Sequence, residues 1–185
     1  MKQGNFEILS NVPLCKGVMK MRLCGDVSAI TRPGQFVNIR LDGQFLRRPI
    51  SVNDVEDGTL TIIYKVVGKG TELMSRLPDG AQLDMLTGLG NGYDLTRSGD
   101  RPLLIGGGVG VPPLYLLAKR LMAEGKRPAV ILGFNTKDEI FGEDDFRALG
   151  CDVTVTTVDG SYGVKGFVTN ALPADYTYFY TCGPE

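Results

Sequence analysis

The feature that most constrains the fold is a glycine-rich run between an apolar segment and an amphipathic one. Residues 102–105 are apolar, residues 106–110 include four glycines, and residues 113–122 carry apolar side chains at helical spacing. This order predicts a strand, a tight turn and a helix, the start of a unit in which helices connect parallel strands. Backbone N–H groups exposed in such a turn can hold a phosphate, but the same turn also serves simply to join a strand to a helix.

The rest of the C-terminal half continues this alternation. We expect strands over 129–134, 152–157 and 176–182 and a helix over 143–149, which together form an α/β domain with a parallel sheet covered on both faces. The last strand is followed only by Gly183-Pro184-Glu185, which looks like the turn into a further helix. Because ligands bind at the carboxyl edge of such sheets, we expect a chain that stops there to be truncated.

The N-terminal half has a different pattern. Short strands are expected over 5–11, 18–25, 35–41, 50–55 and 60–67, with turn residues between them and one helix over 70–77. This pattern predicts a small antiparallel β-barrel. Residues 86–93 form a glycine-rich loop followed by a polar stretch, so we expect two domains, residues 1–98 and residues 99–185.

Charge and hydropathy exclude several kinds of partner. The 185 residues include 20 basic and 21 acidic side chains, with no long run of either sign. The sequence therefore gives no electrostatic argument for binding nucleic acid or an anionic membrane. The N-terminus lacks the apolar core of a signal peptide, and glycines and prolines interrupt the longest apolar stretch, so we expect a cytoplasmic protein without a membrane span.

The absence of histidine removes the usual general base and the commonest metal ligand. The four cysteines, at positions 15, 24, 151 and 182, form no Cys-x-x-Cys pair, so we expect no metal site within this chain. An enzyme of this composition would depend on a cofactor for its chemistry.

A second short run, Leu46-Arg47-Arg48-Pro49-Ile50-Ser51, leads into one of the expected strands. The forked guanidinium of Arg48 could bind a pyrophosphate while the backbone as far as Ser51 lies along a flat ring system. Taken alone, a surface arginine beside a proline is the simpler explanation.

Together, these runs resemble motifs of the ferredoxin reductase family, in the same order along the chain. Residues 48–51 resemble its flavin motif Arg-x-Tyr/Ile-Ser, and residues 108–114 resemble its nicotinamide-domain turn Gly-Thr-Gly-Ile-Ala-Pro-Leu. Further family segments are matched by Pro33-Gly34-Gln35-Phe36, Ile63-Tyr64-Lys65, Gly68-Lys69-Gly70-Thr71 and Cys182-Gly183-Pro184-Glu185. The resemblance covers nearly the whole chain and implies a flavin-binding barrel followed by a nicotinamide-binding α/β domain.

The resemblance also implies site residues. For FAD these are Arg48, Pro49, Ile50, Ser51, Ile63, Tyr64, Lys65, Gly70 and Thr71. For NAD they are Gly107, Gly108, Val109, Gly110, Pro112, Cys182 and Gly183, with Cys182 near the nicotinamide. No catalytic side chain is implied, because hydride transfer between nicotinamide and flavin needs stacked rings rather than a titrating group.

Within the family, residues 46–51, 62–71 and 88–93 are most similar to the electron-transfer subunits of two-subunit, NAD-linked dihydroorotate dehydrogenases, which act in pyrimidine biosynthesis. The similarity implies a relay of electrons between NAD and a dihydroorotate dehydrogenase catalytic subunit as the partner. Those subunits continue to a helix and a cysteine cluster that binds a 2Fe-2S centre, and this chain contains none of those ligands.

Other functions fit the same two domains. The chain could be the flavoprotein subunit of an NAD(P)H:ferredoxin oxidoreductase or of a soluble hydrogenase. It could also be a non-catalytic binding or assembly module that carries no flavin and would be colourless. We expect NAD rather than NADP, because residues 134–139 contain no arginine that could bind a 2'-phosphate and have acids beside a lone lysine.

Overall fold

The computed structural model describes residues 1–183, so Pro184 and Glu185 of the terminal motif lie outside the described residues. The chain divides into two compact units, residues 1–92 and the residues from 93 onward. The boundary expected between residues 98 and 99 stays a prediction. Each unit is described by itself below.

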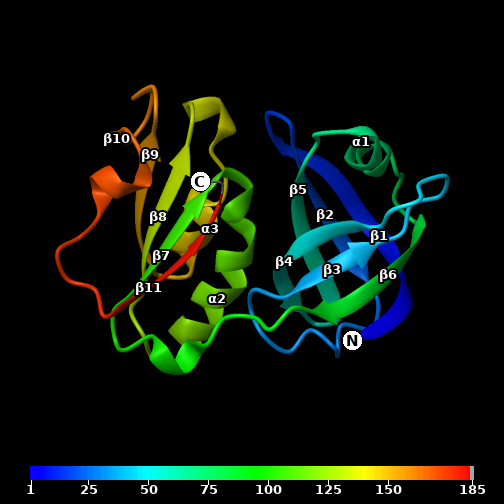
Figure 1. The fold of residues 1–185 in the computed structure, drawn as a ribbon, viewed down its shortest axis with the longest axis horizontal. Coiled ribbons are helices and arrows are strands. Elements are labelled where there is room, and N and C mark those ends of the chain that lie inside the picture. Colours follow the sequence, from blue (N-terminus) through cyan, green and yellow to red (C-terminus); the bar gives the residue numbers. More distant parts are fainter. Residues whose placement is uncertain (184–185) are drawn as a thin grey trace. The chain divides into compact units, whose positions relative to one another are not determined.

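The first unit is a closed, six-stranded antiparallel barrel (Figure 1). Its elements are β1 (Lys2–Cys15), β2 (Val18–Cys24), β3 (Phe36–Ile39), β4 (Arg48–Glu56), β5 (Thr59–Lys65), α1 (Lys69–Ser75) and β6 (Gln82–Leu89). The strand order around the barrel is β1-β2-β5-β4-β3-β6. Alternate residues point inward, and Ile8, Met21, Leu23, Ile39 and Ile62 are fully buried there. Apolar burial of this kind is the main force that holds the barrel closed.

The strand that closes the barrel was not expected. The sequence predicts a glycine-rich loop over residues 86–93, but residues 86–89 belong to β6, which pairs with both β1 and β3. The buried Leu83, Met85 and Thr87 alternate along it with less buried residues, so the two-residue period of a strand was present. The glycines at 88 and 90 obscured that period.

The second unit is a five-stranded parallel sheet with connecting helices. Its strands are β7 (Pro102–Gly107), β8 (Ala129–Phe134), β9 (Asp152–Thr157), β10 (Val164–Lys165) and β11 (Tyr178–Cys182). Its helices are α2 (Pro112–Ala123) and α3 (Glu143–Ala148), and short 3-10 turns are η1 (Leu95–Arg97), η2 (Gly108–Gly110), η3 (Lys137–Glu139) and η4 (Val168–Ala171). The barrel and this sheet confirm the predicted fold class.

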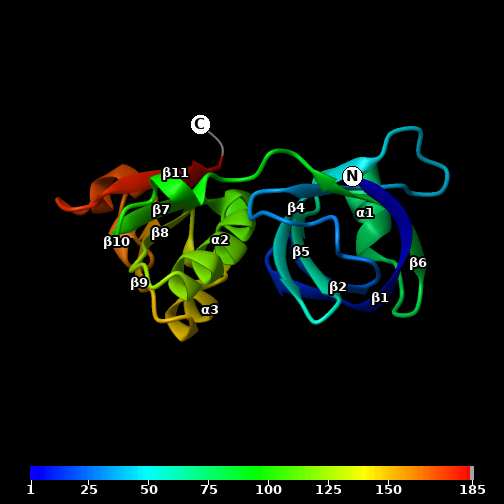
Figure 2. The same cartoon turned by 90° about the horizontal axis from the view of Figure 1, so that it is seen from below.

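The two faces of the sheet are covered differently. Helices α2 and α3 lie on one face (Figure 2). Gly106 points toward this face, where an added Cβ would meet Leu114 of α2, whereas Gly133 points to the other face, where a Cβ would meet Val168 of η4. The expectation of a parallel sheet holds, but helices cover only one of its faces, and the other carries η4 and the adjoining coil.

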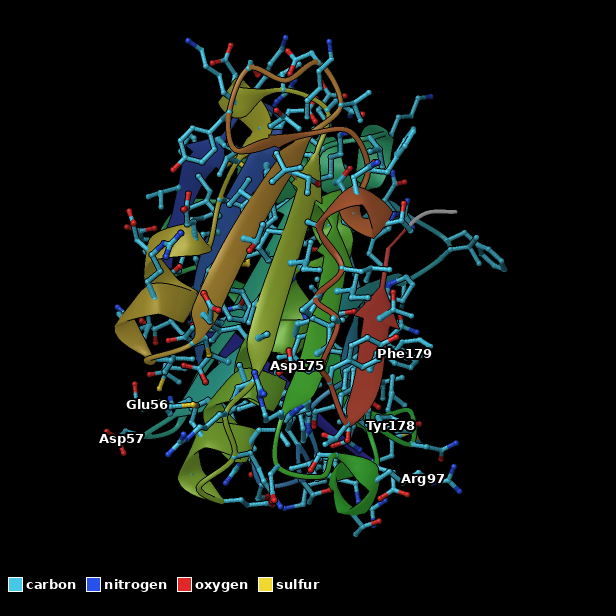
Figure 3. All side chains as sticks on the ribbon, turned by 90° about the vertical axis from the view of Figure 1, so that its left-hand side faces the viewer. Glu56, Asp57, Arg97, Asp175, Tyr178 and Phe179 are labelled. Atoms are coloured by element: carbon cyan, nitrogen blue, oxygen red, sulfur yellow. The ribbon has the colours of Figure 1, made fainter. Side chains whose placement is uncertain are left out.

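The strand order β10-β9-β8-β7-β11 creates a switch point in the sheet. The chain passes from β7 outward through β8 and β9 to β10, then returns to place β11 on the other side of β7. In open parallel sheets, ligands bind outside the carboxyl ends of the strands at such a point. Strand β11, which carries Tyr178 and Phe179 (Figure 3), is the outermost strand of the sheet on that side of β7. None of the helices in the described part of the chain is long and apolar enough to cross a membrane.

Candidate cofactor sites and family

Two adjacent arginines lie at the start of β4, Arg47 just before the strand and Arg48 as its first residue, and they make different contacts. Arg47 forms a forked ion pair with Asp84 of β6, with both Asp84 carboxylate oxygens 3.0–3.2 Å from its guanidinium nitrogens. It also donates to the carbonyl oxygens of Asn38 and Asp84. The pKa of Asp84 is lowered because the bonds from Gln3 and Arg47 outweigh the opposing effect of burial. Arg47 therefore holds three strands of the barrel together.

Arg48 makes only neutral contacts. Its guanidinium donates to the carbonyl oxygen of Leu46 and, at 3.0 Å, to the side-chain oxygen of Gln44. Among the described residues, no carboxylate forms an ion pair with it. An arginine with only neutral partners keeps its full charge for an anionic ligand.

A glycine opposite Arg48 gives its guanidinium space. A Cβ added to Gly70, in the first turn of α1, would lie 1.9 Å from Nε of Arg48. Any residue other than glycine at this position would displace the guanidinium. Residues 48 and 70, which we predicted to bind the same cofactor, are thus direct neighbours.

Strand β4 changes partner at the predicted flavin segment. Residues 48–51 pair with β3, whereas the pairing with β5 begins only at Val52, opposite Ile62. Residues 63–65 of β5 pair with β2 instead. The segments 48–51 and 63–65 therefore belong to neighbouring strands but do not form a ladder with each other, which leaves their facing edges available to a ligand.

Not every predicted flavin residue offers its side chain. Tyr64 is only 2% exposed, and its hydroxyl donates to Asn11 at 2.9 Å. Burial raises its pKa to about 12. The hydroxyl oxygen of Thr71 accepts from the N–H of Val67 and Gly68, so it orders the turn before α1. Tyr64 and Thr71 support the site, while Ile50 and Ser51 are half-buried and Pro49 and Lys65 are exposed.

Asn38 is a candidate that the sequence reasoning missed. It lies on β3 directly opposite Pro49, and its side-chain oxygen is buried without a hydrogen-bond partner among the described residues. A buried polar atom without a partner is costly and is a common mark of a site that a ligand completes. Only the cross-strand register could have shown that Asn38 belongs beside the 48–51 segment.

In the second unit, the two predicted nicotinamide motifs meet. Cys182 of β11 pairs with Gly106 of β7, and a Cβ on Gly110 would lie 2.2 Å from the carbonyl oxygen of Cys182. A Cβ on Gly183 would lie 3.0 Å from the backbone nitrogen of Gly107, a looser but still tight approach. Residues that are far apart in the sequence are thus joined by backbone contact at the carboxyl edge of the sheet.

Gly108 differs from Gly110. It has φ +49°, and a Cβ there would meet nothing within 4 Å, so this residue is a turn former that leaves open space beside it. Pro112 is buried at the first position of α2, and the next residue is also proline. Because prolines lack an N–H, the backbone donors at this edge come from the glycine turn, where Val109 is exposed.

Cys182 is half-buried at the end of β11. Burial raises the pKa of Cys182, and the hydroxyl of Tyr93 partly opposes this increase. The thiol is therefore protonated at neutral pH. Tyr93 is the last residue of the motif at residues 88–93, and its ring packs edge-on against Tyr180 of β11.

These arrangements fit the two cofactors that the sequence suggested. The barrel places a cation without an acidic partner beside a glycine and an open strand edge, which suits a pyrophosphate and a flat ring. The second unit places a glycine turn at a switch point, which suits a dinucleotide. No cluster of acidic or cysteine side chains within the described residues could hold a metal ion.

Comparison with known proteins decides the family. No protein-family model matches the chain. A dihydroorotate dehydrogenase B (NAD(+)) electron transfer subunit from Fusobacterium nucleatum is 44% identical over 200 residues, which cover 100% of this chain and 76% of the relative. The subunit of the same name from Bacillus pumilus is 43% identical over 195 residues, which cover 100% and 75%. This chain belongs to that family of electron transfer subunits.

Solved structures agree with this assignment. The structure of an NADH-dependent reduced ferredoxin-NADP oxidoreductase, described in work on flavin-based electron bifurcation, is 34% identical with a TM-score of 0.87, and the match covers 97% of this chain and 67% of that one. The ferredoxin reductase in carbazole 1,9a-dioxygenase shares the fold, with a TM-score of 0.85 at 23% identity. The chain is thus an oxidoreductase subunit that transfers electrons, and it spans about three quarters of the length of its curated relatives.

Proposed function

We propose that the barrel binds FAD at Arg48, the 48–51 and 63–65 strand edges and the turn at Gly70, and that the second unit binds NAD at the edge formed by residues 107–110, 112 and 182–183. The observation that carries the first assignment is the pair of arginines. Arg47 is committed to Asp84, and Arg48, which makes only neutral contacts, lies against Gly70. If Arg48 had only a structural role, the space that Gly70 leaves for its guanidinium would not be required.

When bound, FAD would supply hydride exchange with the nicotinamide and the release of single electrons. The chain's own residues would bind and orient the two cofactors. Arg48 would neutralise the pyrophosphate, Ile50 and Ser51 would place the strand edge along the flat ring, and the Gly107–Gly110 turn would present backbone donors to the dinucleotide. No side chain needs to exchange a proton, which fits a chain without histidine.

We further propose that the nucleotide is NAD and that the partner is a dihydroorotate dehydrogenase catalytic subunit in pyrimidine biosynthesis. The names of the curated relatives support both points. The segment after β8 contains Asp138 and Glu139 but no arginine, which disfavours a 2'-phosphate. The described residues contain no ligand set for a 2Fe-2S centre. All four cysteines are free thiols, which supports a reducing compartment, the cytoplasm.

The test is a visible spectrum, followed by a titration of the flavin-free chain with FAD and then anaerobic addition of NADH. We expect bound flavin that NADH reduces. Arg48→Ala should weaken FAD binding about 10- to 100-fold, because it removes charge-assisted bonds worth about 1.5–3 kcal/mol. The control is Arg76→Ala, which removes an exposed arginine that follows α1 and forms an ion pair with Glu72 of that helix.

Two results would contradict the proposal. A colourless protein that takes up no added FAD would favour the non-catalytic binding module. Equal FAD affinity in wild type and Arg48→Ala would show that the arginine has no part in the site. For the partner, the measurement is co-sedimentation with a purified catalytic subunit, and failure to form a complex would favour another acceptor, such as a ferredoxin.

A further inference from the structure

The loop between β3 and β4 projects from the wall of the barrel (Figures 1 and 2). At its tip, Phe45 is 100% exposed and Leu46 is 66% exposed. Packing of these two apolar side chains against the barrel therefore does not hold the tip in place. The hydrogen bonds of the loop decide its position.

Gln44 is fixed in this loop through both its backbone and its side chain. Its backbone N–H donates to the carbonyl oxygen of Leu41 at 3.1 Å, which closes a turn in which Gly43 has φ +73°. Its side-chain amide nitrogen donates to the carbonyl oxygen of Gly43 at 3.3 Å. Because the nitrogen of the amide is engaged in this way, the oxygen is left to act as an acceptor.

The amide oxygen of Gln44 accepts a hydrogen bond from the guanidinium of Arg48. The distance from Nη2 of Arg48 to this oxygen is 3.0 Å, and Nη1 donates to the carbonyl oxygen of Leu46. A guanidinium has five N–H donors, of which these bonds use two. The loop thus orients the guanidinium and leaves most of its donors for a ligand, while Gly70 leaves space beside Nε.

We propose that Gln44 is a positioning residue for FAD binding: it fixes the direction of the Arg48 guanidinium without neutralising its charge. A carboxylate in the same place could make the same bond, but it would compete with a pyrophosphate for the arginine. An arginine side chain has large rotational freedom, and ordering it in advance lowers the cost of binding. This inference rests on the proposed function, which places the pyrophosphate of FAD at Arg48.

The competing explanation is that the bond only closes the loop and has no effect on a ligand. Gln44→Glu separates the two explanations, because glutamate has the same length and would hold the loop through an ion pair with Arg48. Gln44→Ala removes the bond altogether. The matched control is Gln82→Glu, which makes the same change of charge at an exposed glutamine of β6.

The first measurement is fluorescence titration of the flavin-free variants with FAD, together with their melting temperatures. Gln44→Glu should weaken FAD binding about tenfold or more, approaching the loss in Arg48→Ala, because its carboxylate occupies the guanidinium. Its melting temperature should equal or exceed that of wild type. Gln44→Ala should weaken binding roughly threefold to tenfold, since the guanidinium then has to be ordered on binding. Gln82→Glu should bind FAD as wild type does.

The second measurement is a double-mutant cycle, which shows whether Gln44 acts through Arg48. In the Arg48→Ala background, Gln44→Ala should have no further effect on FAD affinity, because the group that it positions is gone. A merely structural contribution of Gln44 would instead add to the loss in Arg48→Ala. Full additivity of the two changes would therefore overturn the inference.

The titrations also separate this inference from the proposed function. If Gln44→Glu binds FAD as tightly as wild type, the bond only closes the loop and the inference is wrong. A lower melting temperature in Gln44→Glu that accompanies the loss of affinity would likewise overturn it, because the variant would have damaged the barrel. If Arg48→Ala weakens binding but both Gln44 variants match wild type, this inference alone fails. If wild type takes up no FAD, the proposed function fails, and this inference fails with it.

Discussion

Gly70 in the barrel and Gly110 in the second unit both allow another segment to come closer than a Cβ would permit, but what approaches them differs. Gly70 faces the guanidinium of Arg48, the end of a long, flexible side chain. Gly110 faces the backbone of Cys182 and Gly183, which β7 holds in register. A flexible side chain can move aside at little cost, whereas paired backbone cannot.

The two proposed cofactor sites therefore depend on different parts of the structure, one on a side chain and the other on paired backbone. The barrel site depends on the direction of a side chain, so it can be lost while the fold remains. The nucleotide edge is made of backbone that also forms the sheet, so damage to the site is damage to the fold. The predictions below test that distinction, from the largest expected change in stability to the smallest.

Gly110→Ala should destabilise the second unit most. The added Cβ would lie 2.2 Å from a carbonyl oxygen that the sheet holds in place, and we expect a loss of about 3 kcal/mol or more. Gly108→Ala is the control: it strains a residue at φ +49° but meets no atom, and it should cost about 1–2 kcal/mol. The measurement is urea unfolding followed by a probe in this unit. Equal costs for the two variants would show that the contact at Gly110 relaxes easily.

Arg47→Ala should cost about 2 kcal/mol at neutral pH, since it breaks the forked bond to Asp84 and two bonds to carbonyl oxygens. The pKa of Asp84 is lowered in the fold, so its contribution is present above the ordinary pKa of about 3.9 and is lost as pH falls below it. The gap between wild type and Arg47→Ala should therefore narrow in acid. Urea unfolding at several pH values measures this. A constant gap down to the most acid pH would assign the effect to packing.

Tyr64→Phe should cost about 1 kcal/mol through the lost bond to Asn11. Burial raises the pKa of Tyr64 from 10.0 to about 12, so its contribution is complete below pH 10 and is lost as pH rises toward 12. Wild type should thus lose stability across that range faster than the variant. Tyr176→Phe, which changes an exposed tyrosine, is the control. Parallel curves for wild type and Tyr64→Phe would mean that Tyr64 is not responsible for the alkaline loss.

Gly70→Ala should change stability by less than about 0.5 kcal/mol, because the helix preference of alanine offsets the displacement of Arg48. FAD affinity should nevertheless fall, by about tenfold, since the guanidinium leaves its place. Fluorescence titration with FAD measures this, with Gly4→Ala as the control at a glycine that has free space. Should Gly70→Ala destabilise as strongly as Gly110→Ala, the contrast between the two sites would not hold.

Much of the fold could be predicted because its signals are local. The strand–turn–helix at residues 102–122 follows from glycine and proline chemistry and from helical spacing. The closing strand β6 was missed because its glycines resemble those of a loop, and only the pairing of Leu83 and Met85 across to β1 shows a strand. Arg48 was chosen over Arg47 by motif alone, and nothing in the sequence indicated that Asp84 binds its neighbour.

The sequence by itself determined the two kinds of domain, the two cofactor motifs and the family resemblance, because these depend on residue type and on spacing along the chain. The tertiary structure alone decided which atoms meet: Arg47 with Asp84, Gly70 with Arg48, Gly110 with Cys182, and Tyr64 with Asn11. Such contacts depend on strand register and on the closure of the barrel and the sheet, which bring distant residues within bonding distance and leave no trace in local sequence.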